Sequence, residues 1–159
     1  MIGRNDEPKR PLDAISMLKD DHQTVTHLFA RYESARDFTV KHEVTEKVFA
    51  ALDTHAQLEE TVFYPAYKTR AGKDGTQLVA ESRLEHEKVT ELIRELRGLD
   101  IEDDAFEAKF RGLMNAVQRH VAEEENDMFS EAEQILADQL ADLLDEMVAL
   151  KAQGTTSER

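Results

Sequence analysis

Apolar residues recur every three or four positions along most of the chain, which is the spacing of an amphipathic α-helix. The segments with this spacing are rich in Ala, Leu, Glu, Lys and Arg, which favour helices, whereas glycine and proline are sparse. The pattern predicts an all-α protein. Five helices are expected, over residues 13–35, 40–70, 76–97, 103–130 and 138–152.

Local signals indicate where these helices begin and end. Asp13 is suited to the N-cap of the first helix. The second helix is expected to bend or fray near Pro65 and to end in the turn-forming segment 71–75, which contains two glycines. Asp103 or Asp104 places negative charge at the start of the fourth helix, where the helix dipole favours it. The chain is thereby divided into two helical hairpins and a shorter last helix.

The 159 residues are expected to form one domain, because a chain of this length buries a core without disulfides. We expect a flexible N-terminal segment over residues 1–11, the helical domain over 12–152 and a disordered tail over 153–159. The last helix carries one face of Leu and Met, which we expect to pack across the bundle. The alternative is a surface for a partner or a second copy, so the prediction is a monomer or a homodimer.

Composition excludes several classes of function. The chain has no cysteine, so disulfides, thiolate metal sites and cysteine catalysis are excluded. Its formal net charge, 20 − 34 = −14, disfavours nucleic acid and anionic membranes as partners. Residues 1–11 contain no apolar run typical of a signal peptide or a membrane anchor. We therefore expect a cytoplasmic protein with no nucleic-acid or membrane partner.

The two halves of the chain repeat the same set of metal-binding residue types. Each half has one isolated histidine and one His-x-x-x-Glu pair. The isolated histidines are His22 and His86, which lie 86 − 22 = 64 residues apart. The pairs begin 120 − 55 = 65 residues apart and consist of His55 with Glu59 and His120 with Glu124. Two helical hairpins that offer the same side chains to a common axis predict a two-metal site in a helix bundle.

All six residues lie on the apolar faces of their helices. A buried ligand must share the face of the core residues, whereas a solvated histidine can fall on any face. His22, for example, lies four residues after Leu18 and three before Val25 on the apolar face of the first helix. His27 and His42 lie off these faces. We expect both to be ordinary solvated side chains.

The two glutamates support the metal interpretation, because a carboxylate on a buried face is costly unless it is paired or bound to a metal. At four-residue spacing, the His and Glu of each pair lie one turn apart and can reach one ion or two adjacent ions. Imidazoles combined with carboxylates suit first-row transition metals, iron especially, better than calcium or magnesium. The alternative is a metal-free bundle whose buried polar groups hydrogen-bond one another.

These residues resemble those of the hemerythrin-like, or HHE cation-binding, domain family. The resemblance covers about residues 12–136, and its specific parts are Asp21-His22, residues 55–65, Glu85-His86 and residues 120–129. It implies an up-and-down left-handed four-helix bundle, here with a short additional C-terminal helix. It also implies a non-haem di-iron centre with carboxylate and oxo or hydroxo bridges, which binds O2, H2O2 or NO.

The resemblance also implies a ligand set. His22 and His55 would bind one iron, His86 and His120 the other, and Glu59 would bridge them. The internal repeat selects Glu124 as the second bridge, whereas some family members place this carboxylate one residue later, which selects Glu125.

One position departs from hemerythrins proper, which have a further histidine one turn before the ligand of the third helix. Here that position is Ser82. The candidates for the missing donor are Glu81, Glu85 and a water held by Ser82. Without the fifth histidine both irons would have an open position, which favours reaction with peroxide or oxygen over reversible oxygen storage.

Two classes of function follow. The first is a di-iron protein that binds or reduces a small neutral ligand in a dry apolar pocket, with weak peroxidase-like, catalase-like or NO-reactive turnover. The second is an iron- or oxygen-responsive regulatory or iron-handling protein without turnover. In either class, acidic neighbours of the proposed ligands could orient the imidazoles. These neighbours are Asp21, Glu60, Glu85, Glu123 and Glu125.

Overall fold

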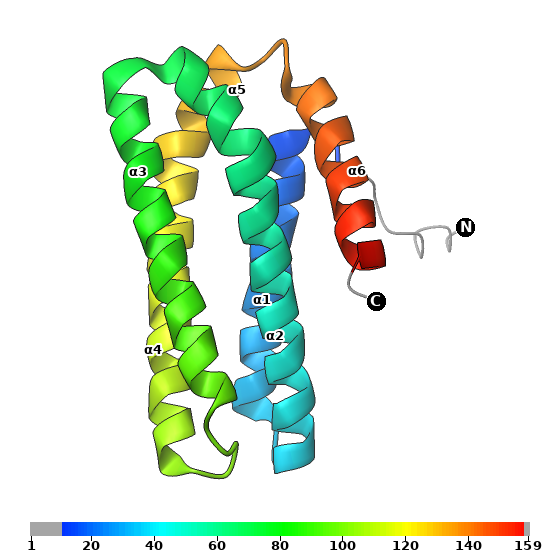
Figure 1. The fold of residues 1–159 in the computed structure, drawn as a ribbon, viewed down its shortest axis with the longest axis vertical. Helices are drawn as coiled ribbons and strands as arrows, with labels where there is room; N and C mark the ends of the chain where they lie inside the picture. Colours follow the sequence, from blue (N-terminus) through cyan, green and yellow to red (C-terminus); the bar gives the residue numbers. More distant parts are fainter. Residues whose placement is uncertain (1–10, 158–159) are drawn as a thin grey trace, which may run out of the picture.

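The computed structural model describes residues 11–157, and within this range it contains helices and no strand (Figure 1). The predicted all-α class is confirmed. The flexible segment expected over residues 1–11 lies, except for Pro11, outside the described residues. The helices are α1 (Ala14–Ser34), α2 (Phe38–Leu58), η2 (Glu59–Phe63), α3 (Tyr64–Arg97), α4 (Asp104–Glu123), η3 (Glu124–Phe129), α5 (Ser130–Ile135) and α6 (Leu140–Ser157).

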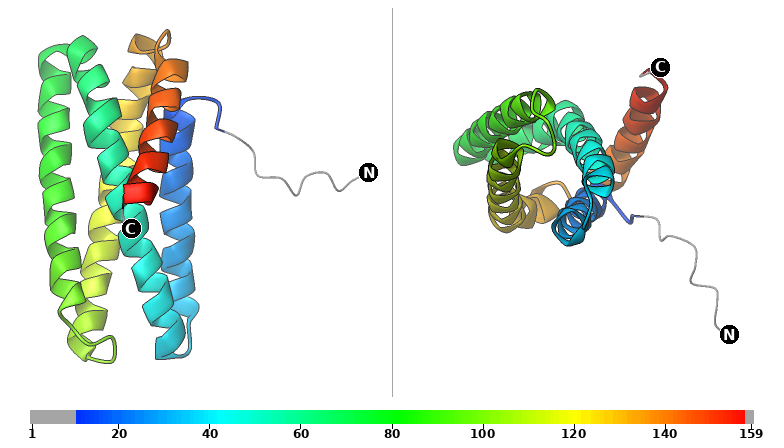
Figure 2. Two further views of the ribbon diagram at one scale, coloured as in Figure 1. Left: turned by 45° about the vertical axis from the view of Figure 1, so that its right-hand side comes forward. Right: turned by 90° about the horizontal axis from the view of Figure 1, so that it is seen from below.

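The elements form four helical rods: α1, then α2 with η2, then the later part of α3, then α4 with η3 and α5. The rods run up and down around a common axis, as the end-on view shows (Figure 2). The chain reverses direction inside α3 at Gly72, whose φ of 76° and ψ of −159° lie in a region that favours glycine. Residues 64–71 therefore continue the second rod, and residues 73–97 form the third. This break confirms the turn predicted over residues 71–75.

Aspartate side chains cap the N-termini of three rods, where backbone N–H groups lack helical partners. Asp13 accepts a hydrogen bond from the Ser16 N–H at 2.9 Å, as the sequence predicts for α1. Asp37 caps α2, so that helix begins two residues before the predicted Val40. Asp103, one of the two predicted candidates, is the N-cap of α4.

The second and fourth rods each contain a π-helix, η2 and η3, that begins at the glutamate of a His-x-x-x-Glu pair. The irregularity predicted near Pro65 is thus a π-helix rather than a simple bend. η3 contains no proline, so the feature belongs to the repeated motif and not to proline alone. Each π-helix changes the helical phase at the middle of the bundle, and such segments are frequent at functional sites.

Two apolar clusters fill the bundle on either side of the six repeated residues. The cluster around Leu18 and Phe63 lies at the α6 end, and the cluster around Phe29 and Phe110 lies at the opposite end. The predicted packing of the last helix is confirmed, because Leu143 and Met147 of α6 are buried against the α1 and α2 rods.

The structure corrects the predicted end of the last helix. α6 continues to Ser157 instead of ending at Ala152, so residues 153–157 of the expected tail are helical and residues 158–159 lie outside the described range. None of the helices described is both long and apolar enough to cross a membrane.

Candidate metal centre

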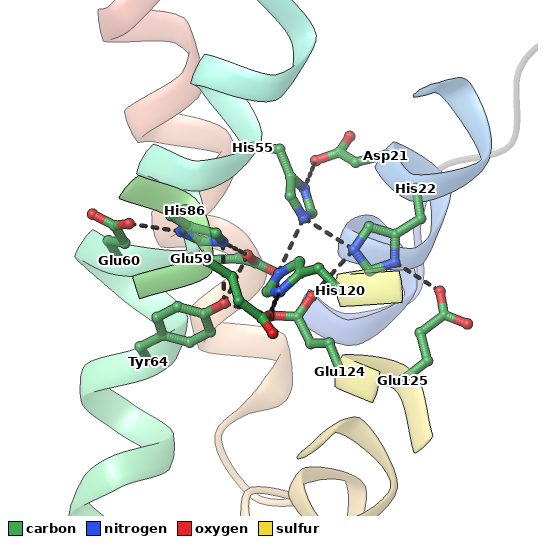
Figure 3. A network of polar contacts seen from close by, with 11 residues as sticks. Asp21, His22, His55, Glu59, Glu60, Tyr64, His86, His120, Glu124 and Glu125 are labelled. Atoms are coloured by element: carbon green, nitrogen blue, oxygen red, sulfur yellow. Dashed lines mark hydrogen bonds and ion pairs between the residues drawn. The ribbon is translucent and has the colours of Figure 1, made fainter. Parts of the chain in front are cut away.

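Six buried polar side chains meet between the two apolar clusters (Figure 3). Each of the four rods contributes a histidine, and each π-helix contributes its first residue, a glutamate. None of the six is more than 8% exposed. The structure therefore brings together every residue that the repeat selects, namely His22, His55, Glu59, His86, His120 and Glu124.

The two carboxylates each lie between a histidine of the first half and a histidine of the second half. Glu59 Oε2 is 3.0 Å from His55 Nε2, and Glu59 Oε1 is 3.1 Å from His86 Nε2. Glu124 spans the other two histidines, at 3.2 Å and 3.7 Å. The potential ligand atoms form two groups that share Glu59, and within each group they lie within 4.8 Å of one another. Histidine and carboxylate atoms at these separations could hold a metal cation.

Each imidazole is held from the outside by a carboxylate of another helix. Because a carboxylate only accepts, we assign the proton to Nδ1, which leaves the Nε2 lone pair directed at the centre. The Nδ1 pairs are His22 with Glu125 at 2.7 Å, His55 with Asp21 at 2.9 Å, His86 with Glu60 at 2.6 Å, and His120 with Glu85. Four of the five predicted acidic neighbours thus orient imidazoles, whereas Glu123 is exposed.

Several inner atoms of the cluster lack a hydrogen-bond donor, and this shortage tests whether the site suits a metal. His22 Nε2 and His55 Nε2 lie 3.1 Å apart. When the proton of each ring is on Nδ1, neither of these Nε2 atoms can donate a hydrogen bond to the other. Glu59 Oε2, His120 Nε2 and Glu124 Oε1 are buried and have no hydrogen-bond partner among the described residues, although imidazole nitrogens lie near both carboxylate oxygens. Converging lone pairs of nitrogen and oxygen fit a transition-metal cation.

The electrostatics of the cluster also require positive charge. Burial lowers the pKa of His55, but the charges of Glu59 and Glu124 and the hydrogen bonds to Asp21 and Glu59 together outweigh burial and hold that pKa well above its ordinary value. Burial also lowers the pKa values of His22 and His86, but both pKa values are raised overall. Burial and then the charge of Glu59 raise the pKa of Glu124. Either protons or metal cations must therefore neutralise the two carboxylates.

The family model of the hemerythrin HHE cation-binding domain matches residues 13–132. The chain belongs to this family. The predicted resemblance and bundle fold are thereby confirmed. Metal cation binding is the property that the family description and the His and Glu cluster share.

Two curated relatives and one solved structure are similar to this HHE domain. An uncharacterized hemerythrin-like protein of Schizosaccharomyces pombe is 26% identical over 105 residues, which are 66% of this chain and 52% of that protein. A DNA nickase of a Nostoc species is 25% identical over 122 residues, which are 77% of this chain and 34% of that protein. The chain thus spans about half or less of these curated relatives.

The solved structure is an HHE cation-binding domain-containing protein of Mycobacterium kansasii, with a TM-score of 0.79 and 23% identity. The match covers 92% of this chain and 89% of that one. At this identity the similarity supports the fold alone.

Within this HHE domain the two candidates for the second bridge occupy different places. The Glu124 side chain is fully buried among the imidazoles, whereas the Glu125 side chain is 35% exposed and binds the outer nitrogen of His22. Glu124 therefore lies inside the cluster, whereas Glu125 contacts one imidazole from the outside. Glu81, the other less certain candidate, is exposed and accepts a hydrogen bond from Gln77.

Sequence reasoning missed Tyr64 as a member of the cluster. Its hydroxyl has one proton to donate and lies 2.6 Å from Glu124 Oε2 and 3.0 Å from Glu59 Oε1, so the two carboxylates share this donor; the hydroxyl also lies 3.3 Å from His86 Nε2 (Figure 3). Tyr64 was overlooked because an aromatic residue on an inward face looks like core. The internal repeat held one sign of a special role for Tyr64. The equivalent residue, 65 positions later, is Phe129, so one half of the chain has a hydroxyl at this position and the other half does not.

Two different cavities reach the cluster. One has a volume of about 40 Å³ and is lined by the four histidines together with apolar residues that include Val25, Leu52, Val89 and Val117. The other has a volume of about 210 Å³ and reaches Ser82 and Glu124 from an acidic surface. The first agrees with the expected dry pocket. The second has no counterpart in the sequence predictions.

Proposed function

We propose that this HHE domain holds two iron ions and uses them to bind or reduce a small neutral ligand. The observation that carries the proposal is the position of the two carboxylates, each within 3.7 Å of one Nε2 from either half of the chain. His22 and His55 would hold one ion, and His86 and His120 the other. Glu59 and Glu124 would bridge the two ions.

The protein's own groups would prepare the site for these ions. The acidic residues on the outside of the imidazoles fix the ring orientations and increase the electron density at Nε2. The Tyr64 hydroxyl holds a proton between the two carboxylates, because burial and their negative charges strongly raise its pKa. Bound iron would supply redox and Lewis-acid chemistry to a ligand in the cavity.

The apolar cavity supports a small, uncharged ligand. Its volume of about 40 Å³ exceeds the roughly 10–15 Å³ that a cavity needs to hold one water molecule. O2, H2O2 and NO fit such a space, and valine and leucine side chains disfavour charged molecules. Reduction of peroxide or oxygen is the reaction that we favour, because the protein offers two histidines to each ion and leaves room for a ligand.

The alternative is an iron-handling or regulatory domain that binds the same ions without turnover. The curated relatives extend well beyond the matched region, so related domains also occur within larger proteins. The activity named for the Nostoc relative is not carried over, because the match covers 34% of that protein and a net charge of −14 disfavours DNA.

Metal content and the absorption spectrum of protein from iron-replete cells test the proposal. We expect two irons per chain and the near-ultraviolet absorption of an oxo-bridged pair. His55→Ala and His120→Ala should each lose iron and this absorption. His27→Ala and His42→Ala are matched controls, because both histidines are exposed as predicted. Iron content unaffected by the first two substitutions would refute the assignment.

Turnover separates the two functions. Consumption of H2O2 or O2 by the iron-loaded protein, absent in His55→Ala and retained in His27→Ala, would support the first. Stable iron binding with no consumption of either would support the alternative.

A further inference from the structure

The internal repeat provides a comparison between the two sides of the bundle. Positions on α1 and α3 correspond at an offset of 64 residues, and positions on the second and fourth rods correspond at 65. On the first side, four positions around the centre are buried and apolar, and they pack in the cluster that α6 completes. These residues are Met17, Leu18, Leu58 and Val62.

The corresponding positions on the second side are polar and line a cavity. They are Glu81, Ser82, Glu123 and Asp127. The cavity has a volume of about 210 Å³ and lies between α3 and the rod formed by α4 and η3. α6 packs against the α1 and α2 rods, so this side lacks the cover that closes the first.

The cavity deepens from exposed acids to a buried carboxylate of the metal centre. Glu81, Glu123 and Asp127 are exposed, Glu85 is half-buried, and Glu124 at the inner wall is 3% exposed. Acidic residues on a surface are by themselves ordinary. The independent observation is Glu124, whose Oε1 is buried and accepts no hydrogen bond.

We propose that divalent metal cations reach the centre through this acidic cavity, whereas neutral ligands use the apolar cavity beside the histidines. The proposal rests on the proposed metal centre and adds the route by which it is loaded. Negative charge at a cleft raises the local concentration of cations, and low-dielectric walls focus that attraction. Successive carboxylates then replace the water ligands of the cation before it reaches the buried histidines.

The apolar cavity is a poor route for the same cation. Its accessible lining is mainly apolar and includes two carboxylates, Asp21 and Asp53, whereas the acidic cavity has five, so a divalent ion would lose hydration and gain fewer oxygen ligands along the way. In this proposal cations enter through the acidic cavity, and neutral ligands enter through the apolar cavity. On the first side of the bundle the repeated positions are apolar, because Leu18 stands where the second side has Ser82, and α6 covers its neighbours.

The rate of metal uptake by the metal-free full chain tests the route. Co²⁺ is the probe, since its visible absorption reports binding without oxidation. The test variant is Glu81→Gln with Asp127→Asn, which removes two charges at the mouth and leaves the residues that contact the histidines. The control is Glu43→Gln with Glu46→Gln, which removes two charges from exposed positions on α2.

We expect the test variant to take up Co²⁺ about three- to tenfold more slowly at low salt, with unchanged final stoichiometry. The control should match the unsubstituted protein. The difference should disappear near 1 M salt, where the screening length is about 3 Å. Ser82→Leu copies the apolar residue of the other side and should slow uptake at every salt concentration by narrowing the cavity.

Two results would overturn the route. Equal uptake rates for the test variant, the control and Ser82→Leu would reject it while leaving the metal centre intact. Absence of Co²⁺ and Fe²⁺ binding to the unsubstituted protein would reject the metal centre itself, and the route with it.

Discussion

Replacement of Glu124 by glutamine, compared with the same change at Glu125, tests the proposed bridge most directly. The two residues are neighbours in sequence, yet their side chains are 0% and 35% exposed. Glu124→Gln removes a negative charge from among the imidazoles. Glu125→Gln keeps an amide oxygen that still accepts from His22 Nδ1. The side-chain volume is almost unchanged in both variants.

The magnitudes follow from the different contacts. A metal ion present at about 1,000 times its Kd stabilises the folded protein by about 4.1 kcal/mol. Loss of a partner outside the ligands lowers metal affinity about 10- to 100-fold, so Glu125→Gln should retain about 1.4–2.7 kcal/mol of that stabilisation. We expect Glu124→Gln to lower affinity about 1,000-fold, because a charged ligand is lost, which leaves about 0.4 kcal/mol.

The assay is urea unfolding of each variant with and without Fe²⁺ under anaerobic conditions. The difference between the two free energies of unfolding isolates the metal contribution from effects on the metal-free fold. Metal-dependent stabilisation as large in Glu124→Gln as in the unsubstituted protein would refute the bridging role. A larger loss in Glu125→Gln would instead assign the bridge to Glu125.

Four further predictions concern the metal-free protein. The free energy of unfolding of the metal-free protein should fall as pH rises above about 6.5. Folding raises the pKa values of three buried histidines, so their protonation stabilises the fold below the unfolded pKa, and this stabilisation is lost as pH rises through the pKa values of the folded state. Urea unfolding between about pH 6 and 9 measures this loss. Tyr64→Phe should lower the free energy of unfolding by about 1–3 kcal/mol, because two buried carboxylates lose the donor that they share. Tyr67→Phe removes a hydrogen bond to an exposed acid, Glu131, and should have a smaller effect. Equal losses of the two variants in urea unfolding would contradict this. Met147→Ala should cost about 2–5 kcal/mol, since this side chain of α6 is fully buried, and a loss below 1 kcal/mol in the same assay would show that α6 is dispensable. Gly72→Ala should destabilise the fold by about 1–2 kcal/mol, because the φ of Gly72 is 76°. Gly112→Ala lies in an exposed part of α4 and should stabilise the fold by up to about 1 kcal/mol. Midpoints of thermal unfolding that move in the same direction for both variants would contradict the conformation of Gly72.

The helices and their buried faces were predictable from the amino-acid sequence alone. Both properties are local, since a 3.6-residue period places His55 and Glu59 on one face whatever the rest of the chain does. The internal repeat extended this reasoning to the other half and selected all six residues of the cluster. The capping aspartate at Asp13 and the break at Gly72 were predictable for the same reason, because each depends on its own segment.

Contacts between side chains of different helices could not be predicted from the sequence. The pairing of Asp21 with His55 and of Glu125 with His22 depends on the rotation and axial offset of neighbouring rods, which no single helix encodes. The contact of Glu125 with the outer nitrogen of His22, beside a Glu124 side chain that is buried among the imidazoles, likewise depends on how the first and fourth rods pack together. The role of Tyr64 arises in the same way, since its hydroxyl matters only where three other segments bring two carboxylates and an imidazole to it.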